Sequence, residues 1–375
     1  MTELRSTEPR TTALHAEHTT LGAHFTDFGG WEMPLRYGSE LAEHRAVREA
    51  AGLFDLSHMG EIRVTGPEAA SFLNTALVGN LAVVATGKAK YSLIVTAEGG
   101  IIDDLIVYRL AEHEFLVVPN AGNAAEVYVQ LVERARGFDV RVDDETASTS
   151  LIAVQGPASA SLIRELNSGD HLVDLEAMPY YSAAMATIAG INVLLARTGY
   201  TGEDGFELLV PNEQAVPLWR ALLQAGEPHG LTPAGLAARD SLRLEAGMPL
   251  YGNELSPDTN PFDAGLGGVV SFKKSENFIG RAALEAMKAE GPRRTLVGLR
   301  GLGRRAGRSG YPVLAEGREV GVVTSGQPSP TLGFPIVLAF VEPGFAAPGT
   351  SLDVDLRGKP EPCEVVTLPF YSRKN

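Results

Sequence analysis

The chain carries one short pattern twice. Residues 63–73 and 153–163 each hold an apolar stretch, a Gly-Pro pair and a run of small and apolar residues, which predicts a strand, a turn and a helix. Residues 116–120 and 208–212 are each an apolar strand that ends in Pro-Asn. The Gly-Pro pairs lie 90 residues apart and the Pro-Asn pairs 92 residues apart. Two related α+β subdomains meeting at a pseudo-symmetric seam are therefore predicted, although Gly-Pro and Pro-Asn are common turn pairs and can coincide by chance.

Helices are expected after both Pro-Asn pairs, over about residues 121–136 and 213–226. Asn120 and Asn212 are suited to accept the first free backbone N–H groups of these helices, so both are predicted as N-caps. A third helix is expected from about Pro233 to Ala246.

The sequence pattern changes beyond Gly291, where short apolar runs alternate with Gly and Pro. The expected strands are 295–299, 320–324, 336–341, 352–356 and 363–368. Short strands at such spacing favour a small antiparallel barrel or sandwich. The predicted domains are residues 1–278, which hold the two subdomains, and residues 279–375.

Charge and cysteine content exclude several classes of protein. The 375 residues carry a formal net charge of −14, which argues against nucleic acid as the main partner. One cysteine, Cys363, excludes a disulfide framework and a thiolate metal cluster, and fits a reducing compartment. Residues 1–12 are polar and resemble no secretory signal, and no apolar run approaches a membrane span of about 20 residues. A soluble cytoplasmic protein without a metal site is expected.

Two adjacent aspartates stand at the head of an apolar strand, after the paired glycines Gly99 and Gly100. Side chains alternate along a strand, so Asp103 and Asp104 should point to opposite faces. One can then remain in solvent while the other points to the interior, where a carboxylate is costly without a partner. The alternative is a hairpin turn that happens to carry charge.

Two further segments contain charged residues that are candidates for a ligand-binding site. Residues 197–207 hold three glycines, with Tyr200 as a stacking face and Glu207 as a hydrogen-bond acceptor, or else form an exposed hairpin. Arg239, Asp240 and Arg243 share one face of the helix expected over 233–246. That stripe is either a solvated face or a place where Arg239 binds an anionic group.

Familiar catalytic signatures are missing from the sequence. It has no phosphate-binding P-loop, no nucleophile elbow and no histidine pair at zinc-protease spacing. His58 stands in a suggestive place, but a lone histidine is more often structural. Any reaction is therefore expected to use positioned carboxylates and a bound organic molecule.

Six segments, taken in order, resemble the aminomethyltransferase (T-protein) family of the glycine cleavage system. The resemblance runs from about residue 15 to residue 372. The segments are 28–35 (FGGWEMPL), 54–61 (FDLSHMGE), 99–108 (GGIIDDLIVY), 197–207 (RTGYTGEDGFE), 239–252 (RDSLRLEAGMPLYG) and 324–333 (TSGQPSPTLG).

The resemblance implies two folate-binding α+β subdomains and a C-terminal antiparallel β-barrel in a clover-leaf arrangement, with tetrahydrofolate in a central funnel. It implies that Asp104 contacts the reacting pterin and is critical for activity, with Asp103 less important. The positions that would line the folate site are Met59, Tyr91, Tyr108, Asn120, Tyr200, Glu207 and Arg239. Arg239 would pair with the glutamyl carboxylate or shape the funnel, and Glu207 would hold the amino and imino groups of the pterin.

The implied reaction transfers the methylene carbon of an aminomethyl group, carried on the lipoyl arm of the H-protein, to tetrahydrofolate. Ammonia is released and 5,10-methylenetetrahydrofolate is formed; the P- and L-proteins of the same system would be further partners, and neither a membrane nor nucleic acid is involved. Ionised Asp104 would stabilise positive charge on the folate amine or the transferred carbon, or would accept a proton from the attacking nitrogen.

Two features qualify the resemblance. Family members often carry Trp near the position of Gly268, so a wall of the funnel is expected to be absent here. The densest basic run would serve as the docking surface for an acidic H-protein, or is a solvated face of the barrel. The run consists of Arg293, Arg294, Arg300, Arg304, Arg305 and Arg308.

Two alternative functions remain open at this point. One is a free-standing tetrahydrofolate-dependent demethylase of a small methylated substrate, which would not require the H-protein. The other is a non-catalytic folate-binding module, whose members carry a Lys-Gly-Cys motif that this sequence lacks around Cys363.

Overall fold

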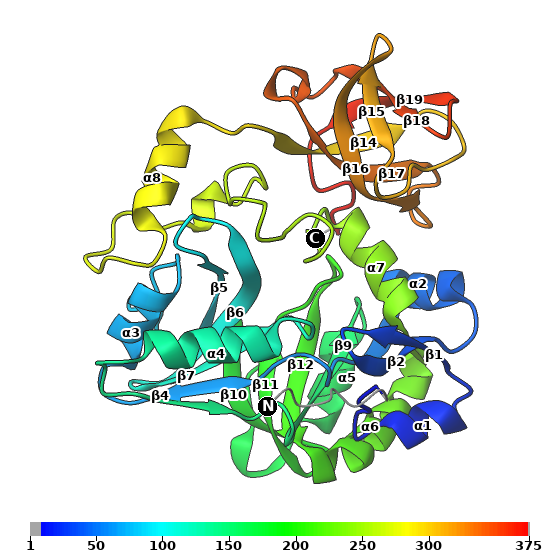
Figure 1. Cartoon of the computed structure of the whole chain (residues 1–375). Helices are drawn as coiled ribbons and strands as arrows, with labels where there is room; N and C mark the ends of the chain where they lie inside the picture. Colours follow the sequence, from blue (N-terminus) through cyan, green and yellow to red (C-terminus); the bar gives the residue numbers. More distant parts are fainter. Residues whose placement is uncertain (1–8, 374–375) are drawn as a thin grey trace.

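The computed structural model describes residues 9–373, so most of the polar N-terminal segment considered above, residues 1–8, lies outside the described residues. Its main part is an eleven-stranded sheet covered by helices, and the C-terminal strands form a barrel above one end of it (Figure 1). Between residues 9 and 373, no helix combines the length and the apolar character needed to cross a membrane.

The two predicted subdomains form one continuous sheet, whose strand order is β13-β3-β9-β12-β11-β10-β5-β6-β7-β4-β8. The first repeat consists of β4 (Ile62–Thr65), α3 (Ala69–Ala76), β5 (Lys88–Val95), β6 (Ile101–Ala111), β7 (Glu114–Pro119), α4 (Ala124–Arg134) and β8 (Arg141–Asp144). The second consists of β9 (Thr149–Gln155), α5 (Ser159–Leu166), β10 (Ser182–Ile188), β11 (Ile191–Arg197), β12 (Gly205–Pro211), α6 (Asn212–Gly226) and β13 (Leu231–Pro233). From the centre of the sheet outward, the first repeat has the order β5-β6-β7-β4-β8. The second has the equivalent order β10-β11-β12-β9-β13, with β3 inserted between β9 and β13. The two halves meet where Ser182 of β10 pairs with Lys88 of β5.

The glycines of the two Gly-Pro pairs show that the repeat is structural. Gly66 and Gly156 have φ of +132° and +133°, a conformation that residues with a side chain rarely adopt. A Cβ atom would lie 2.4 Å from the Asp139 carbonyl oxygen at Gly66 and 2.5 Å from the Ala50 carbonyl oxygen at Gly156. Both turns therefore require glycine, and the strand–turn–helix prediction is confirmed in both halves.

The prediction that Asn120 and Asn212 cap helices is wrong. Helix α4 begins later than expected, after Asn123, and the Asn120 amide donates to Asp103 and Asp104 instead. Asn212 is the first residue of α6, and its side chain donates to the Ala147 carbonyl and accepts from the Ser150 hydroxyl. In both cases a partner distant in sequence takes the amide that a local cap would need.

The N-terminal segment adds elements that the repeat did not predict. They are α1 (His15–Thr20), β1 (His24–Phe28), β2 (Trp31–Arg36), α2 (Glu40–Glu49) and β3 (Ala51–Asp55). Strand β3 lies between β9 and β13, and β1 and β2 form a separate hairpin. Short 3-10 turns occur at η1 (Gly169–His171) and η2 (Glu227–His229).

The second face of the sheet carries helix α7 (Leu236–Glu245), which starts three residues later than predicted because Leu231–Pro233 pairs with β3. Apolar residues alternate along β9: Ile152 and Val154 pack with α5 and α6, whereas Leu151 and Ala153 face α2 and α7. Helices α3 to α6 thus cover one face, and α2 and α7 pack on the other.

A loop with η3 (Gly267–Val269) and α8 (Arg281–Glu290) connects α7 to the barrel. The barrel is closed in the order β14-β17-β16-β15-β18-β19, which confirms the barrel alternative. Its elements are β14 (Thr295–Gly301), β15 (Pro312–Ala315), β16 (Arg318–Pro328), β17 (Pro335–Val341), η4 (Pro343–Phe345), β18 (Ser351–Asp355) and β19 (Pro360–Val366). Only β15, the short strand between two loops, was not predicted, and Cys363 is buried in the barrel core.

Candidate functional site

An inner cavity of about 320 Å³ lies on the face of the sheet that carries α7. Alternation along β6 and β12 directs Asp104, Tyr108 and Glu207 to this face. Their neighbours Val107 and Leu208 pack under the helices. The rest of the wall is largely apolar. It includes Leu56, Leu105, Ile106, Val118, Leu151, Leu209, Met248, Pro249, Leu250 and Leu266.

All eight site residues predicted from the sequence line this cavity. They come from six separate segments: Met59 before β4, Tyr91 in β5, Asp104 and Tyr108 in β6, Asn120 after β7, Tyr200 and Glu207 around β12, and Arg239 in α7. Their convergence makes a single site. Their individual roles toward a ligand remain predictions.

One end of the cavity holds a carboxylate cluster, formed by Asp103, Asp104, Tyr91, Asn120 and Asn123. The Tyr91 hydroxyl donates to Asp104 Oδ2 at 3.0 Å, and Asn120 Nδ2 donates to Asp104 Oδ1 at 2.8 Å. Asp103 is completely buried and accepts from the Asn120 backbone N–H at 2.8 Å and from Asn123 Nδ2 at 2.7 Å. The aspartates point to opposite faces as predicted, but neither faces bulk solvent, because Asp103 lies under the start of α4 and Asp104 lines the cavity.

Both carboxyl groups hold protons more tightly than usual. Burial and the adjacent charge of Asp104 raise the pKa of Asp103 to about 7, although the asparagine N–H groups oppose the shift. Burial also raises the pKa of Asp104, and the hydrogen bonds from Tyr91 and Asn120 offset part of that rise. Near neutral pH the cluster can therefore release or accept a proton.

The opposite wall presents an acceptor and a cation. Glu207 accepts from the Thr198 hydroxyl and, at 3.4 Å, from the Tyr108 hydroxyl. The Arg239 guanidinium lies 4.7 Å from the centre of the Tyr200 ring and has no ion-pair partner among residues 9–373. Desolvation lowers the pKa of Arg239, which remains charged, so it is a half-buried cation free to bind an anionic or carbonyl oxygen.

Glycines bring the loop after β11 close to the sheet. A Cβ atom at Gly199 would lie 2.0 Å from Gln155 Oε1, and one at Gly205 would lie 2.2 Å from Gln155 Nε2. Residues 197–207 are therefore not an exposed hairpin. The Tyr200 hydroxyl is also fixed, because it donates to the Pro249 carbonyl.

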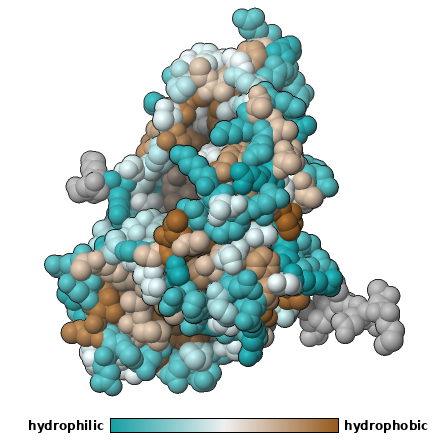
Figure 2. Space-filling view, turned by 90° about the vertical axis from the view of Figure 1, so that its left-hand side faces the viewer, coloured by the Kyte–Doolittle hydropathy of each residue, from teal (hydrophilic) through white to brown (hydrophobic). Residues whose placement is uncertain are grey.

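The inner cavity opens into a larger vestibule of about 720 Å³. Phe28, Tyr200, Arg239 and Leu250 line both spaces and form the neck between them. The barrel contributes Arg308, Gln327, Pro328 and Pro330 to the vestibule but no residue to the inner cavity. The molecular surface is hollowed between the barrel and the rest of the chain on the face shown in Figure 2.

The barrel holds α7 through buried polar groups. Glu245 accepts from the Thr331 backbone N–H at 3.0 Å and from Arg48 Nη2 at 2.8 Å, and it also contacts His44 and Ser329. These five residues are named the anchor cluster. Burial by itself would raise the pKa of Glu245, but the contacts with His44, Ser329 and Arg48 outweigh it and lower that pKa to about 2.

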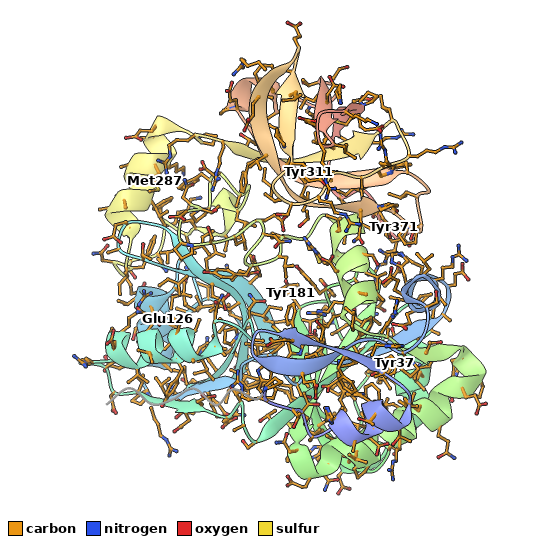
Figure 3. All side chains as sticks on the ribbon, turned by 45° about the vertical axis from the view of Figure 1, so that its right-hand side comes forward. Tyr37, Glu126, Tyr181, Met287, Tyr311 and Tyr371 are labelled. Atoms are coloured by element: carbon orange, nitrogen blue, oxygen red, sulfur yellow. The ribbon has the colours of Figure 1, made fainter. Side chains whose placement is uncertain are left out.

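Arg243 adds a second attachment between α7 and the barrel. It donates to Glu254 at 3.0 Å and to the Ser325 hydroxyl at 2.8 Å, and its side chain is almost fully buried. The solvated-face interpretation of the helix stripe thus holds only for Asp240. The centre of the Tyr371 ring, which is labelled in Figure 3, lies 4.0 Å from the guanidinium carbon of Arg48.

Several lining residues were not predicted from the sequence. Phe28 lies at the tip of the β1–β2 hairpin, and the sequence repeats did not predict this hairpin. Tyr181 lies near the centre of the molecule (Figure 3) and has φ of +62°, a strained conformation found at functional sites. His58, interpreted as structural, lines the cavity. Only the motif 54–61 could have indicated it.

Gly268 is not among the residues that line the inner cavity or the vestibule. It is an exposed residue of η3, two positions after the lining residue Leu266, and a Cβ atom there would meet nothing within 4 Å. A larger side chain would therefore find room at this position.

The chain was compared with family models and known proteins. Residues 14–274 match the GCVT N-terminal domain, and residues 294–372 match the glycine cleavage T-protein C-terminal barrel domain. The aminomethyltransferase of Streptomyces coelicolor is 59% identical over 99% of this chain and all of its own length. That of Saccharopolyspora erythraea is 55% identical over 97% of this chain and 99% of its own. The crystal structure of glycine cleavage system aminomethyltransferase T from Bartonella henselae superposes with a TM-score of 0.90 at 38% identity, covering 96% of this chain and 98% of that one.

Proposed function

The chain belongs to the glycine cleavage T-protein family and is an aminomethyltransferase, and from this premise we propose that the inner cavity binds tetrahydrofolate as the acceptor substrate. The donor is then the aminomethyl group on the lipoyl arm of the H-protein. The P- and L-proteins of the same system are the further partners of this proposal. The full-length match to named aminomethyltransferases carries this proposal.

The polar groups of the cavity support a folate-like ligand. A pterin ring presents N–H donors, for which Asp104 and Glu207 supply acceptors, and a flat apolar surface, for which Tyr200 and the leucines supply contacts. The benzoylglutamate end of folate carries carbonyl and carboxylate oxygens, which suit Arg239 at the neck, a cation without an ion-pair partner among residues 9–373. The vestibule beyond the neck leaves space for the remainder of the molecule and for an incoming arm.

The reaction balances without an oxidant. The carbon–sulfur and carbon–nitrogen bonds of the aminomethyl group break, and two new carbon–nitrogen bonds form to N5 and N10 of the acceptor. The two hydrogens that leave these nitrogens end on the thiol and on ammonia. The task of the protein is to orient the reactants and to stabilise charge.

Asp104 is the group proposed to act on the reacting atoms. Its carboxylate is held by Tyr91 and Asn120, so it is oriented before the ligand arrives. In its ionised form it stabilises positive charge on the acceptor amine or the transferred carbon, and its raised pKa also suits it to accept a proton. Asp103 positions Asn120 and takes no direct part.

We further propose that the H-protein docks beside the vestibule against the basic run of the barrel. Arg293, Arg300, Arg304 and Arg308 are exposed, and Arg308 also lines the vestibule. Arg305 is paired with Glu361 and Arg294 contacts Asp263, so these two contribute less charge than the sequence suggests. Association should weaken as salt rises, and an affinity unchanged between 50 and 300 mM NaCl contradicts the proposal.

The division of the chain at residue 278 is also a proposal. It assigns the two repeats and η3 to the folate-binding part, and α8 with the barrel to the second part.

Reconstitution of glycine cleavage tests the proposed function. P-, H- and L-proteins are incubated with glycine and tetrahydrofolate, with and without this chain, and methylenetetrahydrofolate and ammonia are measured. The expected result is product that requires this chain, the H-protein and tetrahydrofolate together. Product from sarcosine or dimethylglycine without the H-protein would instead favour the demethylase.

A further inference from the structure

His58 lies on a turn whose backbone is fixed from both sides. The Leu56 N–H donates to the Leu151 carbonyl at 2.8 Å, and the Gly60 N–H donates to the Pro119 carbonyl at 3.1 Å. A Cβ atom at Gly60 would lie 2.7 Å from Pro119, so the turn packs directly on the end of β7. The His58 side chain is therefore held in one place relative to the cavity.

The imidazole has no hydrogen-bond partner within the described part of the chain. It is 1% exposed, lines the inner cavity and packs edge to face with Phe28, with ring centres 5.4 Å apart. Nδ1 is buried and unpartnered. Because Nδ1 is the only ring nitrogen that is both buried and unpartnered, Nε2 is the nitrogen that reaches the cavity.

The charge and tautomer of the ring follow from these surroundings. Burial and the charge of Arg239, which outweigh the opposite effect of Asp55, lower the pKa of His58 to about 4, so the ring is neutral near pH 7. A neutral ring carries one N–H. A buried N–H without an acceptor is rarer than a buried lone pair without a donor, so the proton belongs on Nε2. His58 thus presents an N–H donor to the cavity.

Arg239 presents the second set of donors on this part of the wall. Its guanidinium lies at the neck, is unpaired within residues 9–373 and acts electrostatically on His58. The acceptors Asp104 and Glu207, on β6 and β12, line the inner cavity and not the neck. A ligand whose N–H groups face the sheet would therefore bring oxygen atoms to His58 and Arg239.

We propose that His58 binds substrate directly, donating its Nε2–H to a carbonyl or carboxylate oxygen of the benzoylglutamate part of tetrahydrofolate, beside Arg239. The inference rests on the proposed function, because it assumes that tetrahydrofolate occupies the cavity. It assigns a ligand contact to a residue that sequence reasoning regarded as structural.

Binding titrations under anaerobic conditions test the proposal without turnover. The dissociation constant of tetrahydrofolate is measured for the wild-type chain and for His58→Leu, His58→Asn and His58→Gln, and compared with that of 6-methyltetrahydropterin, which lacks the benzoylglutamate part. His58→Leu is expected to weaken tetrahydrofolate about tenfold, as for the loss of one hydrogen bond, and to leave 6-methyltetrahydropterin unchanged. His58→Gln, whose amide N–H reaches as far as Nε2, should recover most of the affinity, whereas the shorter His58→Asn should not.

Controls separate the possible failures. His113→Gln alters an exposed histidine of the β6–β7 turn and should bind as wild type. If wild-type protein binds no tetrahydrofolate, the proposed function fails. If wild type binds and His58→Leu binds equally well, or loses both ligands equally, the donor role of His58 is wrong and the ring only packs. Should His58→Leu not fold, the contrast between His58→Gln and His58→Asn decides the same question.

Discussion

Two groups of carboxylates, one at the end of helix α7 and one on β6, are paired in opposite ways. In the anchor cluster, Glu245 is surrounded by a guanidinium, an imidazole and hydroxyl donors, and its pKa falls to about 2. In the carboxylate cluster, Asp103 and Asp104 have amide and hydroxyl donors but no cationic partner within the described residues, and their pKa values rise. Complete pairing fixes a charge and stabilises the fold. Incomplete pairing leaves a group that can respond to a ligand.

Loss of the Glu245 charge should produce the largest effect. Glu245→Gln removes one of the two carboxylates that pair with the buried Arg48, and the remaining one, Glu203, satisfies only one side of the guanidinium. We expect a loss of about 3–5 kcal/mol in the free energy of unfolding, measured by urea denaturation. Glu98→Gln, at an exposed position, serves as the matched control and should change stability by less than about 0.5 kcal/mol. A Glu245→Gln protein as stable as the control would show that the anchor cluster does not stabilise the fold.

The corresponding change in the carboxylate cluster should affect turnover rather than stability. Asp104→Asn keeps the size of the side chain and removes its charge, so kcat in the reconstituted assay should fall at least about 100-fold, which is about 2.7 kcal/mol. Tetrahydrofolate affinity should change by no more than about threefold. Normal turnover of Asp104→Asn would exclude both roles proposed for this residue.

The two clusters should also respond to pH with opposite signs. Since the pKa of Asp103 is raised to about 7 in the folded state, its contribution to stability is present below about pH 4 and is lost as pH rises to 7. Since the pKa of Glu245 is lowered, its contribution is present above about pH 4.5 and is lost only as pH falls toward 2.

Urea midpoints at pH 5, 6, 7 and 8 measure this difference. The stability of Asp103→Asn relative to wild type should rise between pH 5 and 7, because the variant has no carboxyl group to ionise. The deficit of Glu245→Gln should stay constant over the same range. Parallel curves for both variants would mean that Asp103 is ionised throughout and that the contrast between the clusters is wrong.

The smallest effect is expected at Gly268, two positions after the lining residue Leu266. Gly268→Trp meets no atom within 4 Å of its Cβ and should not change stability by more than about 0.5 kcal/mol. Its ring can cover apolar surface near Leu266, so tetrahydrofolate should bind about two- to fivefold more tightly. Gly268→Ala controls for the backbone, and equal affinity of Gly268→Trp and Gly268→Ala would show that this position does not contact the ligand.

The sequence predicts the parts of the fold that depend on local chemistry. Gly66 and Gly156 mark the repeats because their turns exclude any side chain, and the apolar runs mark the strands on either side. The insertion of β3 between β9 and β13 could not be predicted, because nothing local distinguishes a strand that pairs across a repeat boundary.

The residues of the site also fall into those that the sequence predicts and those that it does not. Asp104 and Glu207 could be placed by strand alternation and by resemblance to a family. The use of Asn120 to hold both aspartates, instead of capping α4, depends on a contact across 16 to 17 residues that competes with a local one. The contact of Phe28 with His58 joins a hairpin tip to a turn 30 residues away, and no periodicity reveals it.

The attachment of the barrel has a consequence for how the whole molecule denatures. Ser325, Ser329 and Thr331 belong to the barrel, yet they complete hydrogen bonds of Arg243 and Glu245 on α7. Unfolding of the barrel alone would leave these buried charges without partners, so the state with only one part folded is costly. The barrel and the sheet-containing part of the chain have separate cores, but they should therefore unfold as one cooperative unit. Calorimetry should then show a single heat-absorption peak.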